Sequence, residues 1–217
     1  MPPARPVDWS LVIPVKVLAL AKSRLAGLAG VTGEQRAELA LAMAADTVAA
    51  AAACPRVGAV IVVTDDDVVG AELDHLGAVV IGDKPARGLN AALVYGAEYA
   101  DSRWPGRGRA ALAADLPALG PGELAVALAA ASAQACAFVP DADGTGTTLY
   151  TAAPGTAFCP RFGPRSRDRH LAAGAVELDL PGIGGLRRDV DTPADLRLAA
   201  GIGLGPRSAA VAALLEL

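Results

Sequence analysis

Aromatic residues, lysine and cysteine are scarce in this sequence. Aromatic residues make up 4% of its 217 residues and charged residues 19%, whereas apolar residues make up 53%. A disordered chain needs low hydrophobicity and high net charge, so this composition excludes disorder. A net charge of −4 and a pI near 5.2 argue against the basic surface of a nucleic-acid-binding protein.

Cysteine occurs only at Cys54, Cys136 and Cys159. An odd number at this wide spacing excludes a disulfide framework, and no C-x-x-C pair indicates a zinc site. Free cysteine usually behaves as a small buried hydrophobic residue, and we expect this of all three. The sequence also lacks an apolar run of about 18 residues and an N-terminal signal-peptide core. We therefore expect a soluble cytoplasmic protein that does not bind membranes.

The sequence shows no repeat, linker or low-complexity tail, and its length fits one α/β domain spanning residues 1–217. Only three of the nineteen lysine and arginine residues are lysines, and alanine is abundant. This bias toward alanine and arginine reflects coding composition and carries no functional information by itself. It makes the position of each lysine more informative.

Short runs of β-branched residues alternate with longer helical segments. We predict strands at 11–15, 57–64, 78–81, 109–114, 136–139, 148–152 and 176–180. We predict helices at 68–75, 90–100, 121–133, 167–173, 192–200 and 208–215, and one from the capping box at 32–35 to residue 54. This alternation predicts a mainly parallel sheet, whose ligands bind where the strands end.

A basic segment follows the first predicted strand. Lys16, Lys22 and Arg24 lie within nine residues, and such cations can neutralise a polyphosphate. The alternative is a solvated basic loop. Gly88 and Asn90 follow the third strand. A glycine allows a ligand to approach the backbone, whereas Asn90 has the structural alternative of capping a helix.

Three aspartates follow predicted strands or extended segments. Asp115 ends a buried apolar run, where an unpaired carboxylate is costly. Asp189 and Asp191 are two residues apart in an extended segment and therefore point to the same side. Their oxygen atoms are suited to a hard cation such as Mg²⁺. The next residues, Thr192, Pro193 and Asp195, have a structural explanation as the start of a helix.

Two further segments contain groups that bind anions. The glycine- and threonine-rich loop 141–148 is either a hairpin turn or a nest of N–H groups around an anion. Segment 161–170 carries four arginines, which favour an anionic substrate. Gly163 and Ser166 precede a predicted helix. We expect His170 to be a surface or capping residue of this helix and not a catalytic base.

Taken together, these motifs resemble a known enzyme family. In order they are Pro-Val-Lys…Ala-Lys-Ser-Arg-Leu, Gly-Leu-Asn, Asp-Leu-Pro, Gly-Thr-Gly-Thr, Arg-Phe-Gly-Pro-x-Ser and Asp-Val-Asp-Thr-Pro. The series is similar to that of the phosphoenolpyruvate or 2-phospholactate guanylyltransferases of deazaflavin coenzyme biosynthesis. The resemblance extends from residue 11 to residue 204. It implies a Rossmann-like three-layer α/β/α sandwich of the nucleotide-diphospho-sugar transferase type, with a mixed, mainly parallel sheet.

The resemblance also implies roles for individual residues. Asp115, Asp189 and Asp191 would hold Mg²⁺, in all two ions. Thr147 would bind the phosphate of the acid, with Thr148 as the alternative, and Gly163 and Ser166 would bind its carboxylate. Lys16, Lys22 and Arg24 would bind the GTP phosphates, and Gly88 and Asn90 would face the nucleoside. Lys16, Lys22 and Asp115 would thus be the catalytic residues. Many relatives are expected to carry arginine where Ala142 stands.

The implied reaction transfers GMP from GTP to the phosphate of the acid and releases pyrophosphate. The expected partners are therefore GTP and a small phosphorylated carboxylic acid, and the alanine and arginine bias favours phosphoenolpyruvate. 2-Phospholactate and 3-phosphoglycerate stay open as acceptors, and the sequence does not determine the oligomeric state. Three alternatives remain: a nucleotidyltransferase acting on a molybdopterin or sugar phosphate, a glycosyltransferase of this fold, and a non-catalytic nucleotide-binding protein.

Overall fold

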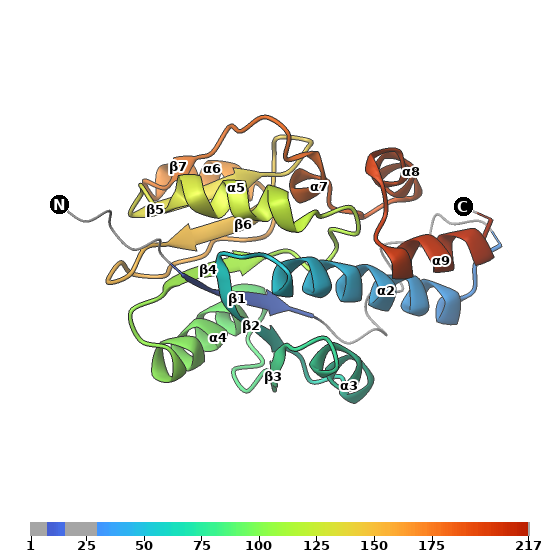
Figure 1. Ribbon diagram of the computed structural model, residues 1–217, viewed down its shortest axis with the longest axis horizontal. Coiled ribbons are helices and arrows are strands. Elements are labelled where there is room, and N and C mark those ends of the chain that lie inside the picture. The colour runs from blue at the N-terminus through green and yellow to red at the C-terminus, as the bar shows by residue number, and fades with distance from the viewer. Residues whose placement is uncertain (1–7, 16–29, 217) are drawn as a thin grey trace.

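A single sheet contains all the strands that the computed structural model describes, within residues 8–15 and 30–216 (Figure 1). The strands are β1 (Trp9–Pro14), β2 (Val57–Val63), β3 (Val79–Ile81), β4 (Gly108–Leu112), β5 (Cys136–Pro140), β6 (Thr147–Ala152) and β7 (Val176–Glu177). Their order across the sheet is β3-β2-β1-β4-β6-β5-β7. Strand β6 pairs antiparallel with both β4 and β5, and the other pairs are parallel. The predicted mixed, mainly parallel sheet is confirmed.

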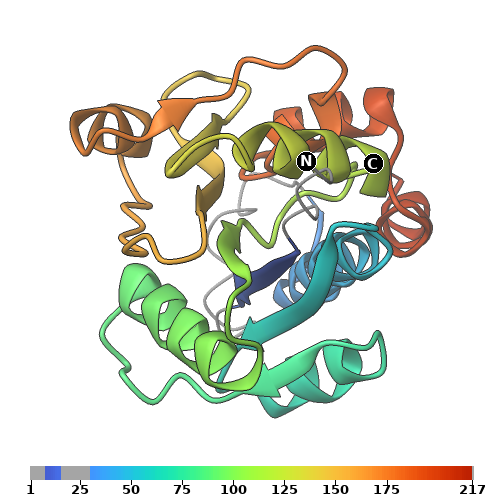
Figure 2. The same ribbon diagram turned by 60° about the vertical axis from the view of Figure 1, so that its left-hand side comes forward.

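Helices cover both faces of this sheet. Those within the described residues are α2 (Gly33–Ala52), α3 (Asp67–Asp74), α4 (Leu89–Arg103), α5 (Pro121–Ala131), α6 (Ser166–Ala172), α7 (Gly184–Arg187), α8 (Pro193–Ile202) and α9 (Pro206–Leu214). Side chains along β1 alternate between two apolar clusters. Leu11 and Ile13 pack with α2, α3 and α5, whereas Val12 packs with α4 on the other face. Figure 2 shows α4 across the sheet from α5. The three-layer α/β/α architecture is confirmed.

Local capping interactions form as the sequence predicts. Thr32 and Gln35 exchange side-chain and backbone hydrogen bonds at the start of α2, and Thr192 and Asp195 do the same at α8. Helix α9 is capped from outside its own segment, where it lies along α2 (Figure 1). The buried Asp46 carboxylate of α2 accepts from the N–H of Arg207 at 3.2 Å and of Ser208 at 2.7 Å.

Some local predictions are wrong. The last strand is shorter than predicted and ends at Glu177, and α7 is not predicted at all. Cys54 is buried, but Cys136 is only partly buried and Cys159 is exposed because it lies in the loop after β6. No helix within residues 8–15 and 30–216 is long and apolar enough to cross a membrane.

Candidate active site

Three aspartates lie around one backbone hydrogen bond beyond the end of β4. The N–H of Val190 donates to the carbonyl oxygen of Asp115 at 3.0 Å. Asp189 and Asp191 are the chain neighbours of Val190, so this bond brings both of them beside Asp115. Val190 is buried in an apolar cluster with Leu196 of α8, which anchors the segment. The structure thus brings the backbones of the three predicted metal ligands into one region.

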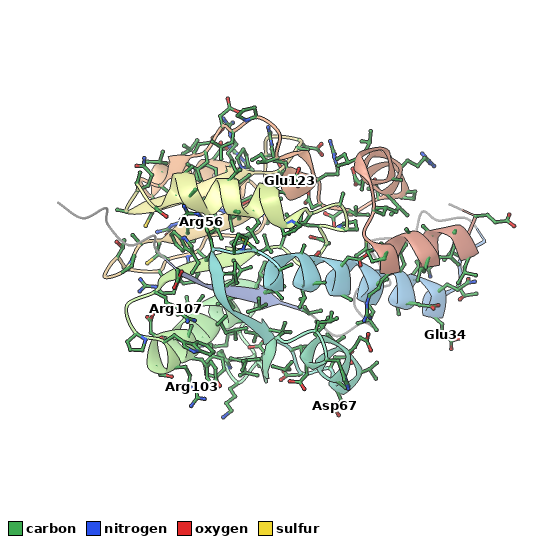
Figure 3. The ribbon with its side chains drawn as sticks, viewed as in Figure 1. Glu34, Arg56, Asp67, Arg103, Arg107 and Glu123 are labelled. Atoms are coloured by element: carbon green, nitrogen blue, oxygen red, sulfur yellow. The ribbon has the colours of Figure 1, made fainter. Side chains whose placement is uncertain are left out.

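Two side chains from helices hold the backbone on either side of these aspartates. The hydroxyl oxygen of Thr47, on α2, accepts from the N–H of Leu116 at 3.1 Å, directly after Asp115. The carboxylate of Glu123, on α5, accepts from the N–H of Gly185 in α7 at 3.1 Å. Figure 3 labels Glu123 at the end of α5 that lies toward α7. Both contacts restrict the loops from which the aspartates project.

Negative charge is concentrated in this region. Burial, together with the nearby carboxylates of Asp115, Asp141 and Asp191, raises the pKa of Asp189 to about 7. Asp141 is a member of this group that the sequence analysis did not assign. A carboxylate among other carboxylates is stabilised in its charged form by a cation.

The donor set suits a hard divalent cation, since all its members are carboxylates. Within residues 8–15 and 30–216, however, no three acidic, histidine or cysteine side chains are already grouped closely enough to hold a metal ion. Asp115 and Asp191 each have an interaction partner within the protein. Cation binding would therefore require these side chains to regroup around the ion. The role of the three aspartates as metal ligands stays a prediction.

The loop between β5 and β6 is a hairpin connection, as one of the two sequence interpretations expects. Two N–H groups of this loop donate to a carboxylate of the protein itself, that of Asp141. The carboxylate of Asp141 accepts from the N–H of Thr145 at 2.9 Å and of Gly146 at 2.7 Å. A Cβ at Gly146 would lie 2.2 Å from Asp141 Oδ2, so this approach requires glycine. The anion-nest interpretation of these N–H groups is therefore wrong.

The two adjacent threonines of β6 differ in environment because successive side chains of a strand point to opposite faces. Thr148 is fully buried, and its hydroxyl finds no hydrogen-bond partner among the described residues. Thr147 is 8% exposed, and its hydroxyl lies 3.0 Å from Nδ1 of His170 in α6. Of the two threonines, Thr147 is the one that retains some exposure to solvent.

Two side chains hold the segment before α6 at Phe162. The Asn90 side chain donates to the carbonyl oxygen of Phe162 at 3.0 Å and accepts from its N–H at 2.8 Å. Arg169 donates to the same carbonyl at 3.0 Å. Gly163 follows with a φ of +111°, in the region that favours glycine, and buried Ser166 begins α6. The N–H of Arg167, directly after Ser166, donates to the carbonyl oxygen of Thr145 in the β5–β6 hairpin at 3.3 Å, so the start of α6 lies beside the loop that leads to Thr147.

The arginines of segment 161–170 do not form one anion-binding cluster. Arg165 pairs with Asp168 at 2.7 Å, and Arg167 pairs with Glu177 at 2.8 Å. Arg169 bonds to the backbone, as described above. Partners within the protein therefore engage three of the four arginines that the sequence associates with an anionic substrate.

His170 has a different position from the one that the sequence predicts. Its side chain is fully buried and not at the helix surface. Its Nε2 accepts from the N–H of Arg161 at 2.9 Å. Its ring stacks on that of Tyr150, with 4.7 Å between the ring centroids. Burial lowers its pKa to about 4, helped by the charges of Arg169 and Arg161. The only sequence signal is the four-residue spacing from Ser166, which puts both residues on one face of α6.

A cavity of about 240 Å³ opens beyond the ends of β1 and β2. Gly88 lines it and is the N-cap of α4, so the expected capping role of Asn90 is wrong. Asn90 does not line the cavity, because its amide bonds to Phe162. Lys16, Lys22 and Arg24 lie outside the described residues. The lining is apolar apart from a threonine and two carboxylates: Pro14, Val15, Val63, Thr64, Asp65, Asp83, Ala86, Gly88, Leu89 and Ala92.

Comparison with known proteins identifies the family. A family model described as guanylyl transferase CofC like matches residues 9–177. The chain belongs to this guanylyl transferase family. The phosphoenolpyruvate guanylyltransferase of Thermomonospora curvata is 58% identical over 207 residues, which cover 95% of this chain and 90% of that protein. The protein of the same name from Streptomyces coelicolor is 56% identical over 209 residues, which cover 96% and 98%.

Solved structures agree with this fold. A nucleotide-diphospho-sugar transferase from Desulfovibrio desulfuricans G20 superposes with a TM-score of 0.67 at 18% identity and covers 88% of this chain and 86% of its own. The predicted fold type is confirmed. Membership of the guanylyl transferase family confirms the predicted enzyme class, nucleotidyltransferase. It decides against a glycosyltransferase and against a non-catalytic nucleotide-binding protein.

Proposed function

We propose that this guanylyl transferase acts on phosphoenolpyruvate: it transfers GMP from GTP to the phosphate of this acid and releases pyrophosphate. The observation that carries the proposal is the identity of 58% and 56% to two proteins of that name, across 95% and 96% of this chain. This span includes the aspartate region, the β5–β6 hairpin and the segment before α6. The reaction belongs to deazaflavin coenzyme biosynthesis.

We assign Asp115, Asp189 and Asp191 as the ligands of two Mg²⁺ ions. When bound, these ions supply positive charge between the two polyanionic substrates and at the leaving pyrophosphate. Asp141 is not a ligand in this proposal, since both its oxygens accept from loop N–H groups. Its role is to shape the hairpin and to add negative charge to the region that attracts the cations.

The acid binds on the α6 side of the site in this proposal. The Thr147 hydroxyl donates to the phosphate, and the N–H groups of Gly163 and Ser166 donate to the carboxylate. Two observations support this placement: His170 joins Thr147 to the segment before α6, and Gly163 leaves its backbone uncovered by a side chain. Thr148 is too deeply buried for the role.

The nucleoside binds in the cavity beside Gly88. Guanine presents two donors on one edge, N1–H and the 2-amino group, and therefore requires acceptors. The cavity supplies the carboxylates of Asp65 and Asp83. Lys16, Lys22 and Arg24 follow β1, whose end forms part of the cavity wall, and we assign them to the GTP phosphates. Asn90 then links the two substrate sites. It lies in the first turn of α4, which begins at the cavity, and its side-chain amide holds Phe162 before α6.

The chemistry requires positioning and charge neutralisation more than proton transfer. A phosphate oxygen of phosphoenolpyruvate attacks the α-phosphorus of GTP, a P–O bond forms, and the bond to the departing pyrophosphate breaks. The attacking oxygen is already anionic, so no general base is needed. The surroundings of His170 agree, since both its ring nitrogens have partners within the protein.

Product analysis tests this proposal. Purified protein is given GTP and Mg²⁺ with phosphoenolpyruvate, 2-phospholactate or 3-phosphoglycerate, and the products are identified by mass spectrometry. We expect the guanylylated enol acid and pyrophosphate with phosphoenolpyruvate, and product formation slowed about a hundredfold or more in Asp115→Asn protein. A product formed only with another acid would contradict the acceptor assignment and leave the guanylyl transfer intact.

A further inference from the structure

The two nitrogens of the His170 ring have different partners, and these determine where its proton lies. The backbone N–H of Arg161 points to Nε2 at 2.9 Å. An amide N–H can only donate, so Nε2 must be the unprotonated nitrogen. The neutral ring therefore carries its proton on Nδ1. This nitrogen lies 3.0 Å from the hydroxyl oxygen of Thr147.

The tautomer in turn orients the hydroxyl of Thr147. With Nδ1–H as donor, the oxygen of Thr147 accepts, and its own proton cannot point at the histidine. No other partner of this hydroxyl occurs among the described residues, and Thr147 is 8% exposed. Its O–H is therefore left to donate toward solvent or a bound anion. The opposite tautomer would turn that proton inward and present only lone pairs, which repel a phosphate oxygen.

The surroundings of His170 keep the ring neutral and fixed. It stacks on Tyr150 at 4.7 Å and on Phe138 at 5.4 Å, and Phe162 meets it edge-on at 5.7 Å. Burial and the charges of Arg169 and Arg161 hold its pKa well below its usual range, whereas the carbonyl of Ser166 acts weakly in the other direction. The ring thus connects β6 with the segment that leads to Gly163.

We propose that His170 is a positioning residue that directs the hydroxyl proton of Thr147 toward the phosphate of the acid substrate. This inference rests on the proposed function, because it needs a phosphorylated acid at Thr147. It gives the histidine a role without direct contact to the substrate. The same ring orders the backbone at Arg161, so one buried side chain prepares both acid-binding elements.

Two substitutions separate the two hydrogen bonds of the ring. His170→Gln keeps an acceptor near Nε2 for the Arg161 N–H but loses the donor that faces Thr147, whereas His170→Asn keeps a donor near Nδ1. We expect His170→Gln to raise the KM for phosphoenolpyruvate by roughly tenfold. The KM for GTP should stay within about twofold of the wild-type value. His170→Asn should raise the KM for phosphoenolpyruvate by less than His170→Gln does. Thr151→Val on the same strand is the matched control and should leave both constants unchanged.

A double-variant comparison and a spectroscopic measurement complete the test. In a Thr147→Val background, His170→Gln should change the KM for phosphoenolpyruvate by no more than about twofold. Equal effects in both backgrounds, or a parallel rise in the KM for GTP, would show a general packing role and overturn the proposal. Nitrogen NMR of the histidine ring should show a protonated Nδ1 in the wild-type protein. A protonated Nε2 would also overturn it, even if variants fold poorly.

Failure of the inference can be told apart from failure of the proposed function. If the wild-type protein forms no product from phosphoenolpyruvate, the proposed acceptor is wrong and this inference falls with it. If it forms the product but His170→Gln leaves the KM for phosphoenolpyruvate unchanged, the function stands and the role of His170 is refuted.

Discussion

Replacement of His170 should remove a specific component of the acid sensitivity of this protein. The pKa of His170 is about 4 in the folded state, against an ordinary value of 6.5. Between these values the unfolded chain binds a proton that the folded chain does not. Because the folded pKa is depressed, the neutral ring costs nothing above pH 6.5, and the free energy of unfolding decreases as the pH falls from 6.5 toward 4.

The magnitude follows from the width of that interval. At pH 5 nearly one more proton is bound in the unfolded state, so the slope approaches about 1.4 kcal/mol per pH unit. Between pH 7 and pH 5 the loss from this residue is then about 2 kcal/mol. In a chain of this length that corresponds to a decrease in Tm of roughly 4 to 8 °C.

Urea unfolding of wild-type and His170→Gln protein at pH 7, 6 and 5 measures this difference, with a chelator present to exclude metal effects. Comparison of two proteins that differ at one residue is necessary, because Asp189 acts in the opposite direction. Its pKa is raised to about 7, so its contribution to stability is present at low pH and lost as the pH rises through 7. We expect the stability difference between the proteins to shrink by about 2 kcal/mol from pH 7 to pH 5. A difference that stays constant would refute a buried, neutral histidine.

Three further predictions concern other parts of the molecule. Asp115→Asn and Asp189→Asn should each lower Mg²⁺-dependent kcat by about a hundredfold or more without lowering the Tm, and near-normal rates at saturating Mg²⁺ would remove that residue from the metal site. Asp65→Asn should raise the KM for GTP by about tenfold and reduce discrimination against ATP, whereas equal losses with both nucleotides would argue against guanine recognition there. Asp46→Ala should lower the free energy of unfolding by about 2 kcal/mol, measured by urea denaturation, because α9 loses its cap; an unchanged midpoint would show that α9 needs no cap from α2.

Much of the fold is predictable because its causes are local. The capping boxes at Thr32 and Thr192 join residues three apart, so the sequence contains both partners. The buried half of β2, residues 60–63, consists of consecutive β-branched residues, and strand ends predict where functional groups project. The motif series is sufficient to place the chain in its family and to select the three aspartates that the structure brings together.

Only the tertiary structure determines what depends on residues far apart in the chain. Strand β6 inserts antiparallel between β4 and β5, a placement that its own six residues do not encode. Asn90 bonds to Phe162 across 72 positions, whereas a local interpretation makes it a helix cap. The N–H groups of the hairpin take up Asp141 instead of a ligand. His170 is buried and neutral because aromatic side chains from two strands and a distant backbone N–H enclose it, and no local pattern encodes partners that only the folded chain brings within hydrogen-bond distance.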